Sequence, residues 1–391
     1  MDRRRFLQRS LASMAFGFAT LEAPRAALPA LPSAGPYRNL LVLIELKGGN
    51  DGFNTLVPFA DPTYYALRPK LAISRDAIVQ LSDRAGLHPA LAPLEPLWKN
   101  RELAILQGVG YPEPNLSHFR SIEIWDTASA AETYLQDGWL TRTFAADPPP
   151  PSFAADGVIV GSNDLGPLAG SGTRTVALAD TEQFLRRARL AAPEGTARNK
   201  ALDHILKVEA DIVQAASHLD ARREFRTEFP ADAFGKAIHT ACQVIANPSG
   251  VAVVRLTLGG FDTHGGQAPT QARLLGSLAG GIVALRSALV EIGRWDSTLV
   301  VTYAEFGRRP RENVSGGTDH GTANVHFALG GRVAGGFYGD GPRLDRLGGD
   351  GNVGYVLDFR GVYATVLERW WGVPSAPIVG GRFPAVPFVR A

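Results

Sequence analysis

The chain has 391 residues, and its 40 Lys and Arg against 38 Asp and Glu give a formal net charge of +2. A charge so close to zero excludes the strongly basic surface by which many proteins bind nucleic acid. The single cysteine, Cys242, excludes an intramolecular disulfide, so the hydrophobic core must stabilise the fold by itself. The length suits one large α/β domain or two small ones.

Residues 1–35 have the features of an export signal followed by a linker. The stretch Arg3-Arg4-Arg5-Phe6-Leu7 resembles a twin-arginine motif. The apolar run at residues 11–21 is too short to span a bilayer but suits a signal peptide. A basic N-terminal arm is the alternative. We favour the signal, because the charges, the apolar run and a linker rich in Ala and Pro follow one another in the expected order.

The predicted signal places the mature protein in the periplasm or outside the cell. Its resemblance to twin-arginine signals implies that the twin-arginine export machinery is a partner, and this machinery carries proteins that are already folded. We expect no stable membrane span and no nucleic-acid partner.

A nearly continuous apolar run at residues 40–47 predicts a strand that is covered on both faces of its sheet. Further strands are predicted at residues 103–109, 158–161, 251–258, 297–303 and 325–329, and helices at residues 87–97, 117–127, 270–292 and 358–371. Residues 181–226 are predicted to form polar helices outside the sheet. Because strands and helices alternate, we predict a doubly wound, mostly parallel sheet with helices on both faces, in a single domain at residues 36–391.

Acidic and imidazole side chains follow three of the predicted strands, in each case beside glycines. These residues are Asp51, Asp262 and His264, and the adjacent pair Asp319 and His320 in a Gly-rich turn. The carboxyl ends of parallel strands meet at one edge of a sheet, which is where α/β proteins bind ligands. Carboxylate oxygens together with imidazole nitrogens suit zinc or manganese better than calcium. Each group taken alone is also ordinary turn chemistry.

Ser117 stands at the predicted start of a helix. A serine at this position is most often a cap that accepts a hydrogen bond from a backbone amide. The same position also suits a nucleophile that acts on an anion, because the free amides and the helix dipole favour negative charge. Arg120, one turn further on, is expected to reach an ester oxygen in that case. Glu305, after the strand at residues 297–303, is a candidate for orienting a histidine.

Five motifs, in order along the chain, resemble an exported bacterial family called domain of unknown function 1501. They are ELKGGNDG (residues 45–52), GVGYPEPNLSHFRS (108–121), GGFDTHGGQ (259–267), EFGRR (305–309) and GTDHG (317–321). The family is grouped with the alkaline phosphatase superfamily. The resemblance therefore implies an alkaline-phosphatase-like doubly wound sheet, with two divalent metal ions above a Ser or Thr nucleophile.

The resemblance also implies roles for individual residues. It makes Ser117 the nucleophile, and it groups as ligands of one metal Asp51, Asp319 and His320. Asp262 and His264 match the ligand pair of the other metal, with the spacing Asp-x-His where the superfamily has Asp-x-x-x-His. The late third histidine of the superfamily is missing, and His326 either takes its place or is a buried strand residue.

Together these features predict an exported, metal-dependent hydrolase of phosphate esters with a serine nucleophile. The substrate would be an anionic ester, either a small molecule or one derived from the cell envelope. We rank sulfate esters below phosphate esters, because the sulfatase signature of Cys or Ser followed by x-Pro-x-Arg is absent. The alternative is a non-catalytic periplasmic protein that keeps this fold for binding or for envelope assembly.

Overall fold

The strand β1 (Leu40–Lys47) shows why a central strand of the sheet has an almost continuous apolar sequence. Its alternate residues Leu40, Val42 and Ile44 pack into the core on one face of the sheet. Leu41 and Leu43 pack into a separate core on the other face. Successive side chains of a strand point to opposite faces, so a strand that is covered on both sides needs apolar residues at nearly every position.

In this computed structural model, which describes residues 35–178 and 223–390, β1 lies inside a nine-stranded sheet. The strands follow the order β13-β5-β12-β9-β1-β8-β6-β7, and β14 pairs with β5. Their bounds are β5 (Leu103–Gly110), β6 (Ala155–Val160), β7 (Thr175–Leu178), β8 (Val251–Gly259), β9 (Thr298–Tyr303), β12 (Asn324–Leu329), β13 (Gly336–Tyr338) and β14 (Leu357–Asp358).

Every pairing in this sheet is parallel except the two made by β12, which runs antiparallel to β5 and to β9. The connection from β9 to β12 contains no crossover helix, so the chain returns beside β9 in the opposite direction. The predicted mostly parallel α/β sheet is therefore confirmed, with β12 as its antiparallel member.

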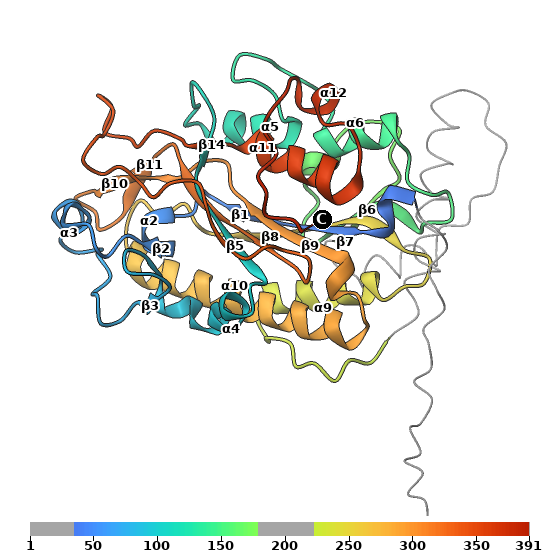
Figure 1. The fold of residues 1–391 in the computed structure, drawn as a ribbon, viewed down its shortest axis with the longest axis horizontal. Helices are drawn as coiled ribbons and strands as arrows, with labels where there is room; N and C mark the ends of the chain where they lie inside the picture. Colours follow the sequence, from blue (N-terminus) through green and yellow to red (C-terminus); the bar gives the residue numbers. More distant parts are fainter. Residues whose placement is uncertain (1–34, 179–222, 391) are drawn as a thin grey trace, which may run out of the picture. The chain divides into compact units, whose positions relative to one another are not determined.

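Helices cover both faces of the sheet (Figure 1). One face carries η2 (Pro89–Leu94), α4 (Glu95–Lys99), α9 (Ala233–Ile245) and α10 (Gln267–Glu291). The other carries α5 (His118–Thr127), α6 (Trp139–Ala146), α11 (Phe359–Ala364), the π-helical segment η5 (Thr365–Trp371) and α12 (Ala376–Val379). Among the described residues, α10 alone has the length and apolar content of a membrane span, but its buried stripe packs in the core.

Two small sheets lie outside the main one. The hairpin of β10 (Arg308–Glu312) and β11 (Thr318–His320) follows β9. A three-stranded sheet consists of β2 (Leu56–Val57), β3 (Val79–Gln80) and β4 (Gly86–Leu87). The short helices α2 (Gly52–Thr55) and α3 (Pro62–Leu67) pack with them around a third apolar cluster. The prediction of a turn at Asp319 and His320 is thus corrected, because both residues belong to a strand of the hairpin.

Two predictions concern segments outside the described residues. The predicted export signal and linker, residues 1–35, fall on the undescribed positions 1–34 except for residue 35, and most of the predicted polar helices fall on positions 179–222. The described residues, 35–178 and 223–390, belong to one compact unit.

Candidate metal centre

The carboxyl ends of β1, β8 and β9 lie side by side, since β1 pairs in register with both of its neighbours. Asp262 and His264 follow β8, and Glu305 follows β9. The hairpin strand β11 brings His320 to the same edge, and the first residue of α5, His118, approaches it from the other side. Four segments that are far apart in sequence thus meet at one edge of the sheet.

The three histidines share one orientation. Each turns Nδ1 toward an acceptor oxygen: the Glu305 carboxylate at 2.8 Å for His118, the Leu116 carbonyl at 2.8 Å for His320, and the Asp319 carboxylate at 3.4 Å for His264. Each turns Nε2 toward the Asp262 carboxylate, at 3.4 Å for His118, 3.3 Å for His320 and 3.1 Å for His264. The imidazoles therefore converge on Asp262.

This orientation has a consequence for metal binding. With the ring proton on Nδ1, beside an acceptor oxygen, each Nε2 has a lone pair that a cation can accept. Partial burial makes the largest contribution to lowering the pKa of His320 below its ordinary value. The lowered pKa favours the neutral ring. The Nε2 atoms of His264 and His320 lie only 2.9 Å apart. Three imidazole Nε2 atoms and a carboxylate thus lie close together, and a bound cation would accept electron pairs from them.

The donor set fits a transition-metal ion. Ligand atoms of His118, Asp262 and His320 lie within 4.8 Å of one another. Two or three imidazole nitrogens with a carboxylate oxygen are typical of zinc, and they also suit manganese. Hydrogen bonds from the remaining ring nitrogens to carboxylates or carbonyls are the usual support of such ligands. His118, Asp262 and His320 would hold the ion, with His264 beside them.

Asp262 is kept ionised by its neighbours. Partial burial raises its pKa, but the hydrogen bond and charge of Arg308, with contributions from His320 and His118, lower the pKa to about 2. The buried guanidinium of Arg308 donates to Asp262 Oδ1 at 2.7 Å, to the Gly49 carbonyl at 2.8 Å and to the Thr318 carbonyl at 2.9 Å. Arg308 therefore joins the ends of β1, β8 and β11 and holds a negative charge at the centre.

Glu305 lies beside a histidine, as the orienting role suggested by the sequence would require. Its Oε1 atom accepts from Gly48 N at 2.9 Å and lies 2.8 Å from His118 Nδ1. The side chain is almost fully buried. Its Oε2 atom has no hydrogen-bond partner among the described residues, so His118 and the Gly48 amide fix this carboxylate through one oxygen.

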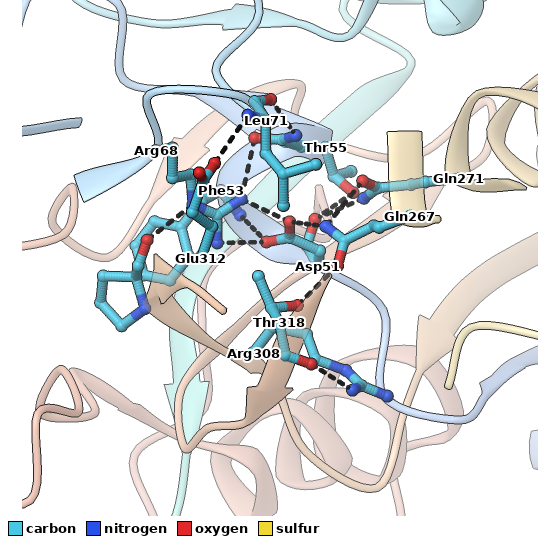
Figure 2. A network of polar contacts seen from close by, with 12 residues as sticks. Asp51, Phe53, Thr55, Arg68, Leu71, Gln267, Gln271, Arg308, Glu312 and Thr318 are labelled. Atoms are coloured by element: carbon cyan, nitrogen blue, oxygen red, sulfur yellow. Dashed lines mark hydrogen bonds and ion pairs between the residues drawn. The ribbon is translucent and has the colours of Figure 1, made fainter. Parts of the chain in front are cut away.

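Asp51 lies in a different, buried network (Figure 2). Its carboxylate forms a bidentate ion pair with Arg68, at 2.5 and 3.0 Å, and accepts from Gln267 at 2.5 Å. The structure does not place Asp51 in the group that contains Asp262 and His320. The expected trio of Asp51, Asp319 and His320 is therefore not the group that the geometry brings together.

Two other predicted residues lie beside the centre. Ser117 is the N-cap residue of α5, but its side chain makes no capping hydrogen bond and it is exposed to solvent. It lies between Leu116, whose carbonyl binds His320, and His118. Asp319 is exposed at the rim, where Asn313 donates to it at 3.2 Å. These positions are compatible with roles at the centre.

The geometry does not support the expected roles of Arg120 and His326. The guanidinium of Arg120 donates to the carbonyls of Ala131 and Thr133 at 2.9 and 2.7 Å, so it braces a loop instead of reaching toward an ester. His326 lies in β12, fully buried against Trp125, and it is not part of the ligand group. Burial alone lowers the pKa of His326 to about 3. Its alternative interpretation, a buried strand histidine, is the one that the structure favours.

The residue that the sequence interpretation missed is His118. Its neighbour Ser117 has the more familiar position for a reactive side chain. The available signal was the place of His118 at the first turn of a helix whose start meets the same sheet edge. Only the folded chain shows which side chain of that turn faces Asp262.

Three cavities among the described residues lie away from this group of side chains. Two of them, of about 300 and 760 Å³, share the loop around Gly341 and Arg343, on the side of the short helix α2. Neither these two nor a third cavity near Pro374 is lined by His118, Asp262 or His320. The candidate metal centre is therefore identified by the chemistry of its side chains.

Comparisons with known proteins give a family match. The family model "Protein of unknown function (DUF1501)" matches residues 98–368. None of the curated proteins that were compared matches the chain.

Similar solved structures include the lipoteichoic acid synthase LtaP from Listeria monocytogenes, at 9% identity and TM-score 0.36, over 76% of this chain and 66% of that one. The C-terminal periplasmic domain of EcEptC from Escherichia coli, in complex with Zn, matches at 12% identity and TM-score 0.35, over 75% and 72%. The alkaline phosphatase of the Antarctic bacterium TAB5 matches at 11% identity and TM-score 0.34, over 77% and 94%. This chain thus spans just under two thirds of the synthase. At these TM-scores the matches carry no argument about its activity.

Proposed function

The chain belongs to the DUF1501 family of proteins of unknown function, and we propose that it is a metal-dependent hydrolase of phosphate esters. The observation that carries this proposal is the convergence of three imidazole Nε2 atoms on Asp262, each with its Nδ1 held by an acceptor oxygen. Imidazoles whose Nδ1 atoms face acceptor oxygens are typical ligands of transition-metal ions, and here three of them surround a carboxylate.

In this proposal His118, Asp262 and His320 bind one divalent ion, zinc or manganese. A bound ion of this kind polarises phosphoryl oxygens and lowers the pKa of a nearby hydroxyl. The exposed amides at the start of α5 provide further stabilisation for the negative charge of a phosphate.

Ser117 is the proposed nucleophile. Its hydroxyl is exposed, makes no capping bond and lies between two residues that contact the centre. Ser117 Oγ would bond to phosphorus as the ester oxygen leaves, and the hydroxyl proton would end on the departing alcohol. Water would then cleave the phosphoserine and release phosphate. Phosphate esters rank above sulfate esters because the sulfatase signature is absent from the sequence.

The test combines metal content with hydrolysis. We expect the purified protein to contain zinc or manganese and to hydrolyse an aryl phosphate mono- or diester faster than an aryl sulfate. Asp262→Asn should lose most of the metal and the activity, because an incomplete ligand set binds weakly. Asp296→Asn, at an exposed aspartate before the start of β9, is the matched control and should keep both.

The alternative function is non-catalytic binding or envelope assembly. A protein that binds metal through Asp262 but hydrolyses neither the aryl phosphate esters nor the aryl sulfate would favour that alternative. A protein without metal affinity would contradict the proposal as a whole.

A further inference from the structure

Asp51 stands at the end of β1, where the family resemblance leads one to expect a ligand of a second metal ion. Both of its oxygens already accept two hydrogen bonds each. Oδ1 accepts from Phe53 N at 3.1 Å and from Arg68 Nη2 at 3.0 Å. Oδ2 accepts from Arg68 Nη1 and from Gln267 Nε2, both at 2.5 Å. The residue is only 2% exposed, so no free side of the carboxylate faces the surface centre.

We infer that Arg68 takes the place of the second cation, so that this chain binds one metal ion and uses Asp51 as a positioning residue. The inference deepens the proposed function and depends on the ion proposed there.

Every N–H donor of the Arg68 guanidinium forms a hydrogen bond. Besides its two bonds to Asp51, it donates from Nε to the Pro310 carbonyl at 2.7 Å. It also donates to Asn54 Oδ1 at 2.9 Å and to the Arg309 carbonyl at 2.9 Å. These five contacts use all five N–H donors of an arginine, and the side chain is 0% exposed. A built arrangement of this kind is specific for a guanidinium and is not a surface ion pair.

Charge explains why a second ion does not fit beside this pair. Arg68 carries a permanent positive charge at every relevant pH, and it already neutralises Asp51. A divalent ion on Asp51 would face that charge at contact distance in a buried setting, where screening by water is weak. To admit the ion, Arg68 would have to leave its carbonyl partners and remain buried without a counter-charge.

Gln267 connects Asp51 to Thr318, the residue before Asp319 and His320 (Figure 2). The bond to Asp51 uses the Gln267 amide nitrogen, so the amide oxygen faces the other way. That oxygen accepts from Thr318 Oγ1 at 2.7 Å and from Thr263 Oγ1 at 3.1 Å. Thr263 lies between Asp262 and His264 in the loop after β8. Thr318 directly precedes Asp319 and His320 in β11. Asp51 and Arg68 are therefore connected through Gln267 to a threonine side chain in each ligand segment, and they support these segments from outside the centre.

The experiment is a zinc titration with a competing chelator, read together with the mass of the metal-loaded chain under native conditions. It uses the parent protein, Asp51→Asn, the charge-neutral pair Asp51→Asn with Arg68→Gln, and Asp262→Asn. We expect about one equivalent in the parent and in both Asp51 variants, with affinity lowered by at most about 10–100-fold, as for a residue that supports ligands without binding the ion. Asp262→Asn should fall far below one equivalent.

The outcomes separate the two proposals. A parent that binds two equivalents, or a folded Asp51 variant that binds one fewer than the parent, overturns the inference and leaves the proposed function standing. A parent that binds none overturns the proposed function. If Asp51→Asn alone does not fold, because Arg68 is left unpaired, the charge-neutral pair and the stoichiometry of the parent decide the result.

The spectrum of the cobalt-loaded protein gives a readout that is independent of activity. If Asp51 only positions the ligand segments, the cobalt absorption bands of the parent and of the charge-neutral pair should coincide. A shift of these bands like that caused by losing an oxygen ligand would overturn the inference.

Discussion

His118 and Glu305 are 187 residues apart in sequence, yet His118 Nδ1 lies 2.8 Å from Glu305 Oε1. Glu305 is almost fully buried at the end of β9, whereas His118 is partly exposed at the start of α5. The contact joins a strand end to a helix start across the metal centre. It orients the His118 ring so that Nε2 faces Asp262.

The first prediction concerns this contact. Glu305→Gln should lower zinc affinity by about tenfold, because a neutral amide accepts a weaker hydrogen bond and makes His118 a poorer ligand. A competition titration measures the change. Glu291→Gln is the control, since Glu291 likewise accepts backbone N–H groups and lies at the end of α10, outside the centre. Unchanged affinity in a folded Glu305→Gln protein would contradict the orienting role.

The second prediction concerns Ser117. Because its side chain makes no capping bond, Ser117→Ala should change the free energy of unfolding by less than the roughly 1 kcal/mol of a lost cap. The rate of aryl phosphate hydrolysis should fall by orders of magnitude while metal content stays constant. Ser287→Ala, on the exposed face of α10, should change neither metal content nor rate. Hydrolysis at the parent rate by Ser117→Ala would instead indicate direct attack by water.

The third prediction concerns Arg120. Arg120→Met removes the bonds to the carbonyls of Ala131 and Thr133 and the contact with the Tyr134 ring, 3.7 Å from the guanidinium carbon. We expect the free energy of unfolding in urea to fall by about 1–3 kcal/mol, with KM for the ester changed less than about twofold. A tenfold rise in KM at unchanged stability would instead indicate that Arg120 contacts the substrate.

The fourth prediction concerns His326 and pH. Burial lowers its pKa from the ordinary 6.5 to about 3 in the folded state. Between these two values the unfolded chain binds the proton and the folded chain does not, so stability falls as pH falls from 6.5 toward 3. From pH 6.5 to 5 this residue should account for about 2 kcal/mol.

His326→Phe should therefore flatten the dependence of the unfolding free energy on pH across that window. The substitution removes no hydrogen bond, since neither ring nitrogen has a partner among the described residues. His239→Gln, at an exposed histidine of α9, should leave the parent slope unchanged. Parallel slopes for His326→Phe and the parent would show that His326 titrates normally.

The fifth prediction concerns export. If the N-terminal segment is a twin-arginine signal, replacing both Arg3 and Arg4 by Lys should strongly reduce the amount of protein in the periplasmic fraction. The control is Arg9→Lys, which makes the same chemical change just outside the motif and should leave the yield unaltered. An unchanged periplasmic yield for the double variant would remove the twin-arginine assignment.

Local sequence patterns were enough to predict the architecture of the sheet. Residues 40–47 and 251–258 are apolar at nearly every position, as a strand covered on both faces requires, and both are central parallel strands. The same patterns located Asp262, His264 and His320 at strand ends or beside them. These features depend on residues that are close in sequence, so composition and periodicity are enough to predict them.

Which side chains share the centre depends on how distant segments pack. Asp51 and Asp262 have the same sequence signature, an aspartate beside glycines after a buried strand. One is neutralised by Arg68 and the other faces three histidines, because the side chains around each come from remote segments. Likewise, the direction of the first turn of α5 makes His118 face Asp262, and no local pattern encodes that direction. Such contacts form only when the whole chain packs, so these assignments came from the fold and not from the sequence.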